Sequence, residues 1–160
     1  MSDFTRDTVL VLATLTMGMM AGVFAFYSHT VMRGLGRTDD RTFVSAFQAM
    51  DRAIINPRFM LTFLGALVLT GLAGVLSLGD PALPWIVAAF GLYLVVFIIT
   101  MTVNVPLNNA IKAAGDVDRI ADLAEVRRRF DEARWVAWNH GRTAASMIAA
   151  VSLAIALLRS

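Results

Sequence analysis

The feature that most constrains this chain is a set of four long apolar segments separated by charged connectors. They cover residues 8–32, 59–78, 85–105 and 135–158, and the first three contain no Asp, Glu, Lys or Arg. Each is long enough to cross a bilayer core of about 30 Å, which takes roughly 20 helical residues. The chain is 58% hydrophobic and 16% charged, more apolar than soluble domains usually are. The sequence therefore predicts an all-α integral membrane protein, a four-helix bundle in one transmembrane domain over residues 1–160.

The connector between the first two segments predicts one further helix. Phe43, Phe47, Met50 and Ile54 recur at spacings of four, three and four, which places them on one helical face. This helix is expected at the cytoplasmic interface. The third apolar segment runs into Pro106, which lacks a backbone donor, so we expect the helix to kink or end there.

Basic residues indicate the topology. Twelve of the fourteen Lys and Arg flank the first and third connectors, so the positive-inside rule places both connectors in the cytoplasm and both termini outside. This distribution also explains the pI of 9.7 without a nucleic-acid partner. The first segment is too long for a signal peptide and no positive stretch precedes it, so a retained helix is expected. The expected location is a bacterial inner membrane.

This topology brings polar residues to the cytoplasmic end of the bundle. Ionisable and polar groups at membrane depth are costly, so they usually face a bundle interior or a cavity. His29 continues a stripe from Gly18 and Gly22 and is expected to point into the bundle. The other residues expected in this layer are Asn56, Asn104, Asn108, Trp135, Trp138, Asn139, His140 and Arg142. Of these, Trp135, Trp138, Asn139 and Arg142 share one helical face, and His140 lies about 100° further round.

Each of these residues also has an ordinary structural interpretation. Trp135 and Trp138 suit an interfacial aromatic belt, Arg142 suits a side chain that extends to lipid headgroups, and Asn104 suits a helix end. Histidines at helix ends often serve only as hydrogen-bonding residues. Because all of these residues gather on one side of the membrane, we favour a functional site over a set of separate explanations.

Four motifs resemble those of the anthrone oxygenase family of small four-helix membrane proteins. They are Gly22–His29 with Val31–Met32, Phe47–Phe59, Asn104–Asn108 and Trp135–Thr143. Together they extend over nearly the whole chain, and only Asp51 departs from them, at a position where Asn is equally expected. The resemblance implies the four-helix fold. Some fungal members of the family oxidise polyketide anthrones to anthraquinones with O2, which implies O2-dependent oxidation of a hydrophobic aromatic, polyketide-type molecule.

For such a reaction the resemblance suggests specific roles. An anthrone has an acidic CH2 group, so a positioned base can remove a proton; His29 is the first candidate and His140 the second. Asn104, Asn139 and Arg142 are expected to stabilise the developing oxyanion, and Trp138 to stack on the substrate. The further binding residues are Trp135, Asn56, Asn108 and Tyr27. The resulting anion can react with O2 directly, so O2 is the expected co-substrate and no cofactor is required.

Other functions remain open from the sequence. His29 and His140 are alternative ligands for haem or copper, since neutral imidazole is a common metal ligand. A non-enzymatic membrane protein that binds a lipid, a quinone or a partner protein is the rival from another class, and a homo-oligomer is compatible with either. Solute transport is disfavoured, because transporters place polar groups near the bilayer midplane and the middles of the second and third segments are apolar.

Overall fold

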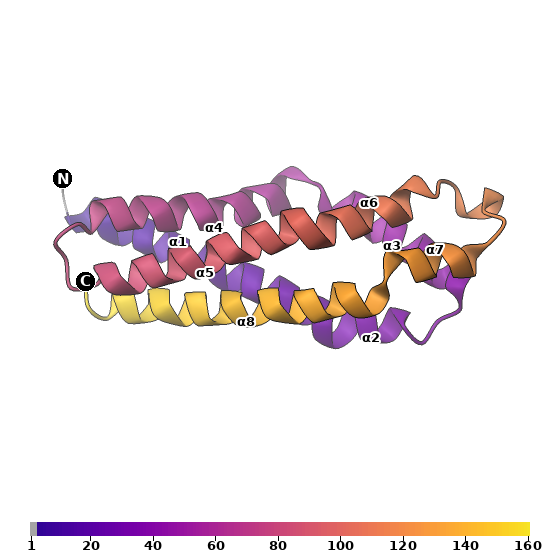
Figure 1. The fold of residues 1–160 in the computed structure, drawn as a ribbon. Helices are drawn as coiled ribbons and strands as arrows, with labels where there is room; N and C mark the ends of the chain where they lie inside the picture. The colour runs from indigo at the N-terminus through magenta and orange to yellow at the C-terminus, as the bar shows by residue number, and fades with distance from the viewer. Residues whose placement is uncertain (1–2) are drawn as a thin grey trace.

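The computed structural model describes residues 3–160, which form a long helical bundle with a helical cap at one end (Figure 1). The bundle consists of α1 (Asp3–Phe26), α4 (Pro57–Leu76), α5 (Leu83–Ile99) and α8 (Glu132–Leu157). The cap consists of α2 (Met32–Leu35), α3 (Asp40–Ile54), α6 (Val105–Ala113), the 3₁₀ turn η3 (Val117–Arg119) and α7 (Leu123–Phe130). The start of α1 and the end of α8 lie at the opposite end of the bundle.

The predicted membrane helices are confirmed. The helical stretches Phe4–Leu35, Pro57–Leu76, Leu83–Ala113 and Leu123–Leu157 are long and apolar enough to cross a membrane. The last of them is interrupted at Asp131, between α7 and α8. The predicted further helix is α3, which buries Phe43 and Phe47 in the cap. Its first turn is capped by Asp39, whose Oδ1 accepts a hydrogen bond of 2.8 Å from the Thr42 N–H, and this hydrogen bond lowers the pKa of Asp39.

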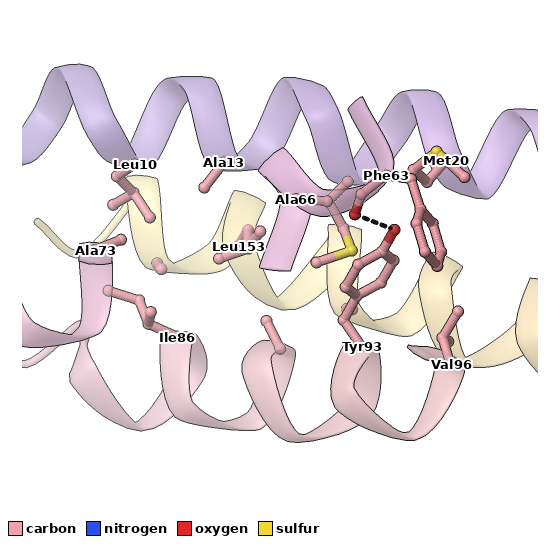
Figure 2. Close-up of a cluster of buried hydrophobic side chains, with 14 of the residues drawn as sticks. Leu10, Ala13, Met20, Phe63, Ala66, Ala73, Ile86, Tyr93, Val96 and Leu153 are labelled. Carbon is pink, nitrogen blue, oxygen red and sulfur yellow. Dashed lines mark hydrogen bonds between the residues drawn. The ribbon is translucent and has the colours of Figure 1, made fainter. Parts of the chain in front are cut away.

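The bundle core is built from small and medium-sized side chains at the helix contacts (Figure 2). Ala13, Ala66 and Ala73 are fully buried there. Small residues allow helix backbones to approach closely in a membrane, where the hydrophobic effect does not drive helix association. The buried Tyr93 hydroxyl donates to the Phe63 carbonyl at 3.1 Å and so links α5 to α4. The core thus fixes the helices below the cap.

The stripe of small residues on α1 lies on the outer surface. Gly18 and Gly22 are exposed, and a Cβ added at either would meet no atom within 4 Å. This face of α1 therefore does not pack against another helix of the bundle. The buried face of α1 instead carries Met17, Met20 and Phe24. It is rotated by about 100°, the angle between neighbouring residues of a helix, from the face of the glycines.

Two of the long helices contain a π-helical segment below the cap. The segment η1 covers Tyr27–Val31 and η2 covers Thr100–Asn104. The third helix does not end at Pro106, one of the two expected outcomes, but runs on as α6 to Ala113. A proline clashes with the carbonyl four residues before it, and the wider turn of η2 directly before Pro106 accommodates that conflict.

Candidate functional site

A pocket of about 290 Å³ lies where the cap joins the bundle. Its lining comes from α1, η1, α3, α4, η2, α6 and α8. Most of the lining is apolar or aromatic, and the polar or charged members are Tyr27, Asp51, Thr100, Asn104, Asn108, Asn109, Lys112, Trp135, Asn139 and Arg142. Ligand pockets usually measure about 300–1,000 Å³, so this one suits a small molecule.

The inner wall of the pocket carries a buried arginine. Arg142 is 5% exposed. Its Nη1 donates to Thr100 Oγ1 at 3.1 Å and its Nη2 donates to Asn139 Oδ1 at 2.6 Å. The guanidinium carbon lies 4.5 Å from the centre of the Phe24 ring and 5.6 Å from that of Trp135. Within residues 3–160 no carboxylate is ion-paired with it, and its Nε is buried without a hydrogen-bond acceptor.

Asn139 holds the arginine in place. Its Nδ2 donates to the Phe24 carbonyl at 3.0 Å and to Ser28 Oγ at 2.6 Å. Both bonds cross from α8 to the end of α1, so the amide is fixed with its oxygen toward Arg142. Since the Nδ2 hydrogens are used in this way, Asn139 positions Arg142 and does not itself face a ligand as a donor.

The outer part of the pocket contains an ion pair beneath α3. Asp51 is 6% exposed, and its Oδ1 accepts a hydrogen bond of 2.6 Å from Asn108 Nδ2. Lys112 Nζ lies 2.7 Å from the other oxygen, Oδ2, an ion pair without hydrogen-bond geometry. Trp135 Nε1 donates to Asn108 Oδ1 at 2.7 Å, which connects this pair to α8. Asp51 is the carboxylate among the lining residues that the structure describes.

Six of the residues predicted from the sequence line this pocket. They are Tyr27, Asn104, Asn108, Trp135, Asn139 and Arg142. The Tyr27 ring centre lies 6.1 Å from that of Trp135. Asn104 is buried and donates through Nδ2 to the Trp135 carbonyl at 3.3 Å, while its Oδ1 has no partner.

The two histidines lie outside the pocket. Both are exposed, and their ring centres are 6.2 Å apart on the outer face of the bundle. The expectation that His29 points into the bundle is wrong, because it lies on the same outward face as Gly18 and Gly22. The neighbouring Ser28 takes the inward position and is 1% exposed. A haem or copper ion bound by this pair would therefore lie outside the pocket.

Two other predicted residues are also placed elsewhere. Trp138 is 43% exposed, and it does not belong to the lining, although Trp135, Asn139 and Arg142 on the same helix do. Asn56 caps α4: its Oδ1 accepts a hydrogen bond of 3.0 Å from the Phe59 N–H. Asn56 is likewise absent from the lining.

Asp51 and Lys112 are the charged lining residues that the sequence analysis did not select. A signal for Asp51 was present, because it follows Phe47 by four residues on the apolar face of α3. A single carboxylate on a buried helical face needs a partner. Nothing in the sequence indicated that Lys112 is that partner, since the two residues meet only through the packing of α6 against α3.

Comparison with known proteins gives one match. A family model described as anthrone oxygenase matches residues 58–152. The matched region includes α5, η2, α6, α7 and most of α8, and thus the lining residues from Phe59 to Arg142. No curated protein and no solved structure matches the chain significantly.

Proposed function

Since the chain belongs to the anthrone oxygenase family, we propose that it uses O2 to oxidise a small aromatic molecule in the pocket between bundle and cap. The observation that carries this proposal is the combination of aromatic walls with a buried arginine that has no carboxylate partner among the side chains described, residues 4–160. Such a site accommodates a flat ring system and stabilises negative charge that develops on it. We also place the cap in the cytoplasm of a bacterial cell, supported by the twelve basic residues that flank the first and third connectors.

The proposed reaction converts a CH2 group between two aromatic rings into a ketone. A base removes one proton, and the negative charge spreads onto the conjugated carbonyl oxygen. The carbanion carbon then forms a bond to O2, and protonation gives a hydroperoxide. Loss of the remaining C–H proton with cleavage of the O–O bond forms the C=O group and releases water. One oxygen atom thus enters the product and the other leaves as water.

Within this reaction Arg142 is proposed to stabilise the oxyanion. A charged donor held in a water-poor pocket lowers the energy of an anion far more than it would in water. Asn139 and Thr100 fix the guanidinium by accepting hydrogen bonds from Nη2 and Nη1. The guanidinium therefore needs little reorganisation when the oxyanion forms. Trp135 and Phe24 provide aromatic surface next to it.

The proposed proton acceptor is Asp51 in place of His29. Asp51 lines the pocket, and its Oδ2 has an ion-pair contact but no hydrogen bond. The ammonium group of Lys112 lies beside the Asp51 carboxylate. Asn108 fixes the orientation of that carboxylate by a hydrogen bond. A general base must lie within reach of the proton it removes, which favours a lining residue over the exposed histidines.

The experiment is oxygen uptake by protein in lipid nanodiscs after addition of anthrone, with the product analysed after reaction under ¹⁸O2. We expect uptake above the rate of empty nanodiscs and one labelled oxygen atom in anthraquinone. Arg142→Met is expected to lower the rate, and Arg134→Met, an exposed arginine on the same helix, serves as the matched control. The activity is tested with several anthrones that differ in their ring substituents. Oxygen uptake equal to that of empty nanodiscs with all of them would refute the proposed activity.

A further inference from the structure

We propose that the pocket selects aromatic ligands that already carry a negative charge, with Arg142 as the anion-binding residue. This inference rests on the proposed function for the location of the ligand, but it concerns binding and does not require turnover. The ligand class is a small aromatic acid whose ionised oxygen, of a carboxylate or of an acidic phenol, accepts a hydrogen bond from the guanidinium of Arg142.

The first argument is the charge balance of the buried groups. Asp51 is paired with Lys112 at 2.7 Å and Arg6 with Asp80 at 2.6 Å. Arg127 in the cap is paired with both Asp40 and Glu132. Arg142 is buried without such a partner, so the lining keeps one net positive charge. A buried charge without a counter-ion is strongly unfavourable, and an anionic ligand supplies the missing partner.

The second argument is the unused donor of the guanidinium. Nη1 and Nη2 each donate one hydrogen bond, to Thr100 and Asn139, and each has a second hydrogen, whereas Nε is buried without an acceptor. The aromatic rings of Phe24 and Trp135 offset part of the charge through cation–π contacts, but rings do not accept the Nε hydrogen bond in place of an anion. Because the other nitrogens are held by α8 and η2, the orientation of Nε is fixed before a ligand arrives.

The third argument is the shape and the chemistry of the remaining lining. The pocket is lined by the aromatic residues Phe24, Phe59, Phe63 and Trp135, and its volume is about 290 Å³. Of these residues, Phe24 and Trp135 lie against the guanidinium of Arg142. Aromatic side chains favour ring systems through stacked and edge-to-face contacts. The volume is small for a lipid chain with a headgroup, so we assign the anion to an aromatic acid.

The test is calorimetric titration of the protein in zwitterionic nanodiscs with 2-naphthoate, the isosteric neutral 2-naphthamide and dodecanoate. We expect 2-naphthoate to bind at least about tenfold more tightly than 2-naphthamide, the range of a hydrogen bond to a charged group. Arg142→Met should remove the preference, so that 2-naphthoate binds no more tightly than 2-naphthamide. Arg134→Met should keep the wild-type preference.

Defined outcomes overturn the inference. Equal binding of naphthoate and naphthamide by the wild-type protein, or an unchanged preference in Arg142→Met, contradicts anion selection by this residue. Dodecanoate binding as tight as that of 2-naphthoate contradicts the aromatic class and assigns the site to fatty acids. If Arg142→Met does not fold, Arg142→Gln replaces it, because glutamine is polar but carries no charge: loss of the preference for 2-naphthoate supports the inference, and an unchanged preference refutes it.

The same preparations separate this inference from the proposed activity. Oxygen uptake with anthrone but no preference for 2-naphthoate leaves the activity and refutes anion selection. A preference for 2-naphthoate without oxygen uptake refutes the activity and leaves a membrane protein that binds aromatic acids. Both results are obtained from wild-type protein, so neither depends on the stability of a variant.

Discussion

The hydrogen bonds of Asn139 predict that Asn139→Leu lowers the stability strongly, and that most of this loss depends on the charge of Arg142. Leucine has the same number and branching of side-chain heavy atoms, so the loss of polar partners is the effect considered. Two neutral bonds, to Phe24 and Ser28, cross between helices, and such bonds contribute about 0.6 kcal/mol each in membrane proteins. The third bond, from Arg142, involves a buried charge and is worth about 1.5–3 kcal/mol. The free energy of unfolding should therefore fall by about 3–4 kcal/mol.

The condition is the charge of Arg142. In an Arg142→Met background no charged donor loses its acceptor, so Asn139→Leu should then cost only about 1 kcal/mol. The assay is reversible unfolding in bicelles by steric trapping for both single variants and the double variant. Asn109→Leu, at an exposed asparagine, is the control and should change stability by less than about 0.5 kcal/mol. Additive effects within about 0.5 kcal/mol would show that Asn139 does not hold the arginine, and would refute this reasoning.

Three further predictions concern residues outside that network. Asp51→Asn retains an acceptor for Asn108 but removes the proposed base, so oxygen uptake should fall by about a hundredfold or more; an unchanged rate would exclude Asp51 as base. His29→Ala and His140→Ala should keep the wild-type rate of uptake, because both side chains lie outside the pocket, and a loss in either would restore the histidine hypothesis. The pKa of Asp39 is lowered by the Thr42 N–H, so its stabilisation of α3 is present above the ordinary pKa of 3.8 and is lost as the pH falls through the lower folded value. Hydrogen exchange at the start of α3 should therefore show reduced protection in acid, and Asp39→Ala should show it at neutral pH, whereas equal protection in both proteins would contradict the capping role.

The helices were predictable because their signals are local. Long uncharged segments have few alternatives to a membrane helix, and the Asn56–Pro57 pair and the periodic apolar residues of α3 define the boundaries of the connector. The same local signal failed at Pro106, where the sequence indicates a break and the helix continues. Whether a proline ends a helix depends on how the preceding turn adjusts. The helix propensity of proline carries no information about that adjustment.

The site was predictable only where the residue type restricted the environment. Arg142 and Asn139 are too polar for lipid contact, so their placement at an internal wall follows from the cost of exposing them. Trp138 and His140 are amphipathic and tolerate the outer surface near the membrane interface, where the structure places them. The Asp51–Lys112 pair joins residues 61 positions apart, and no local pattern indicates such a contact.

The π-helical segment η1 keeps the polar residue Ser28 on the buried face of the first helix. Buried residues on α1 follow the α-helical spacing up to Phe24, but the next two, Ser28 and Met32, come at steps of four and four. An α-helix would rotate such a series off its face, whereas the wider turn of η1 keeps it there.

The same change of spacing occurs in η2, where Val96, Thr100 and Asn104 are buried at steps of four and four. In both helices it is a polar residue that the wide turn directs inward: Ser28 holds Asn139, Thr100 holds Arg142, and Asn104 lines the pocket. Buried positions at successive steps of four, with a polar residue among them, therefore mark this arrangement in both helices. Pro106, just after η2, favours the wide turn on which that arrangement depends. In the first helix this series includes Ser28 and leaves His29 on the outer face.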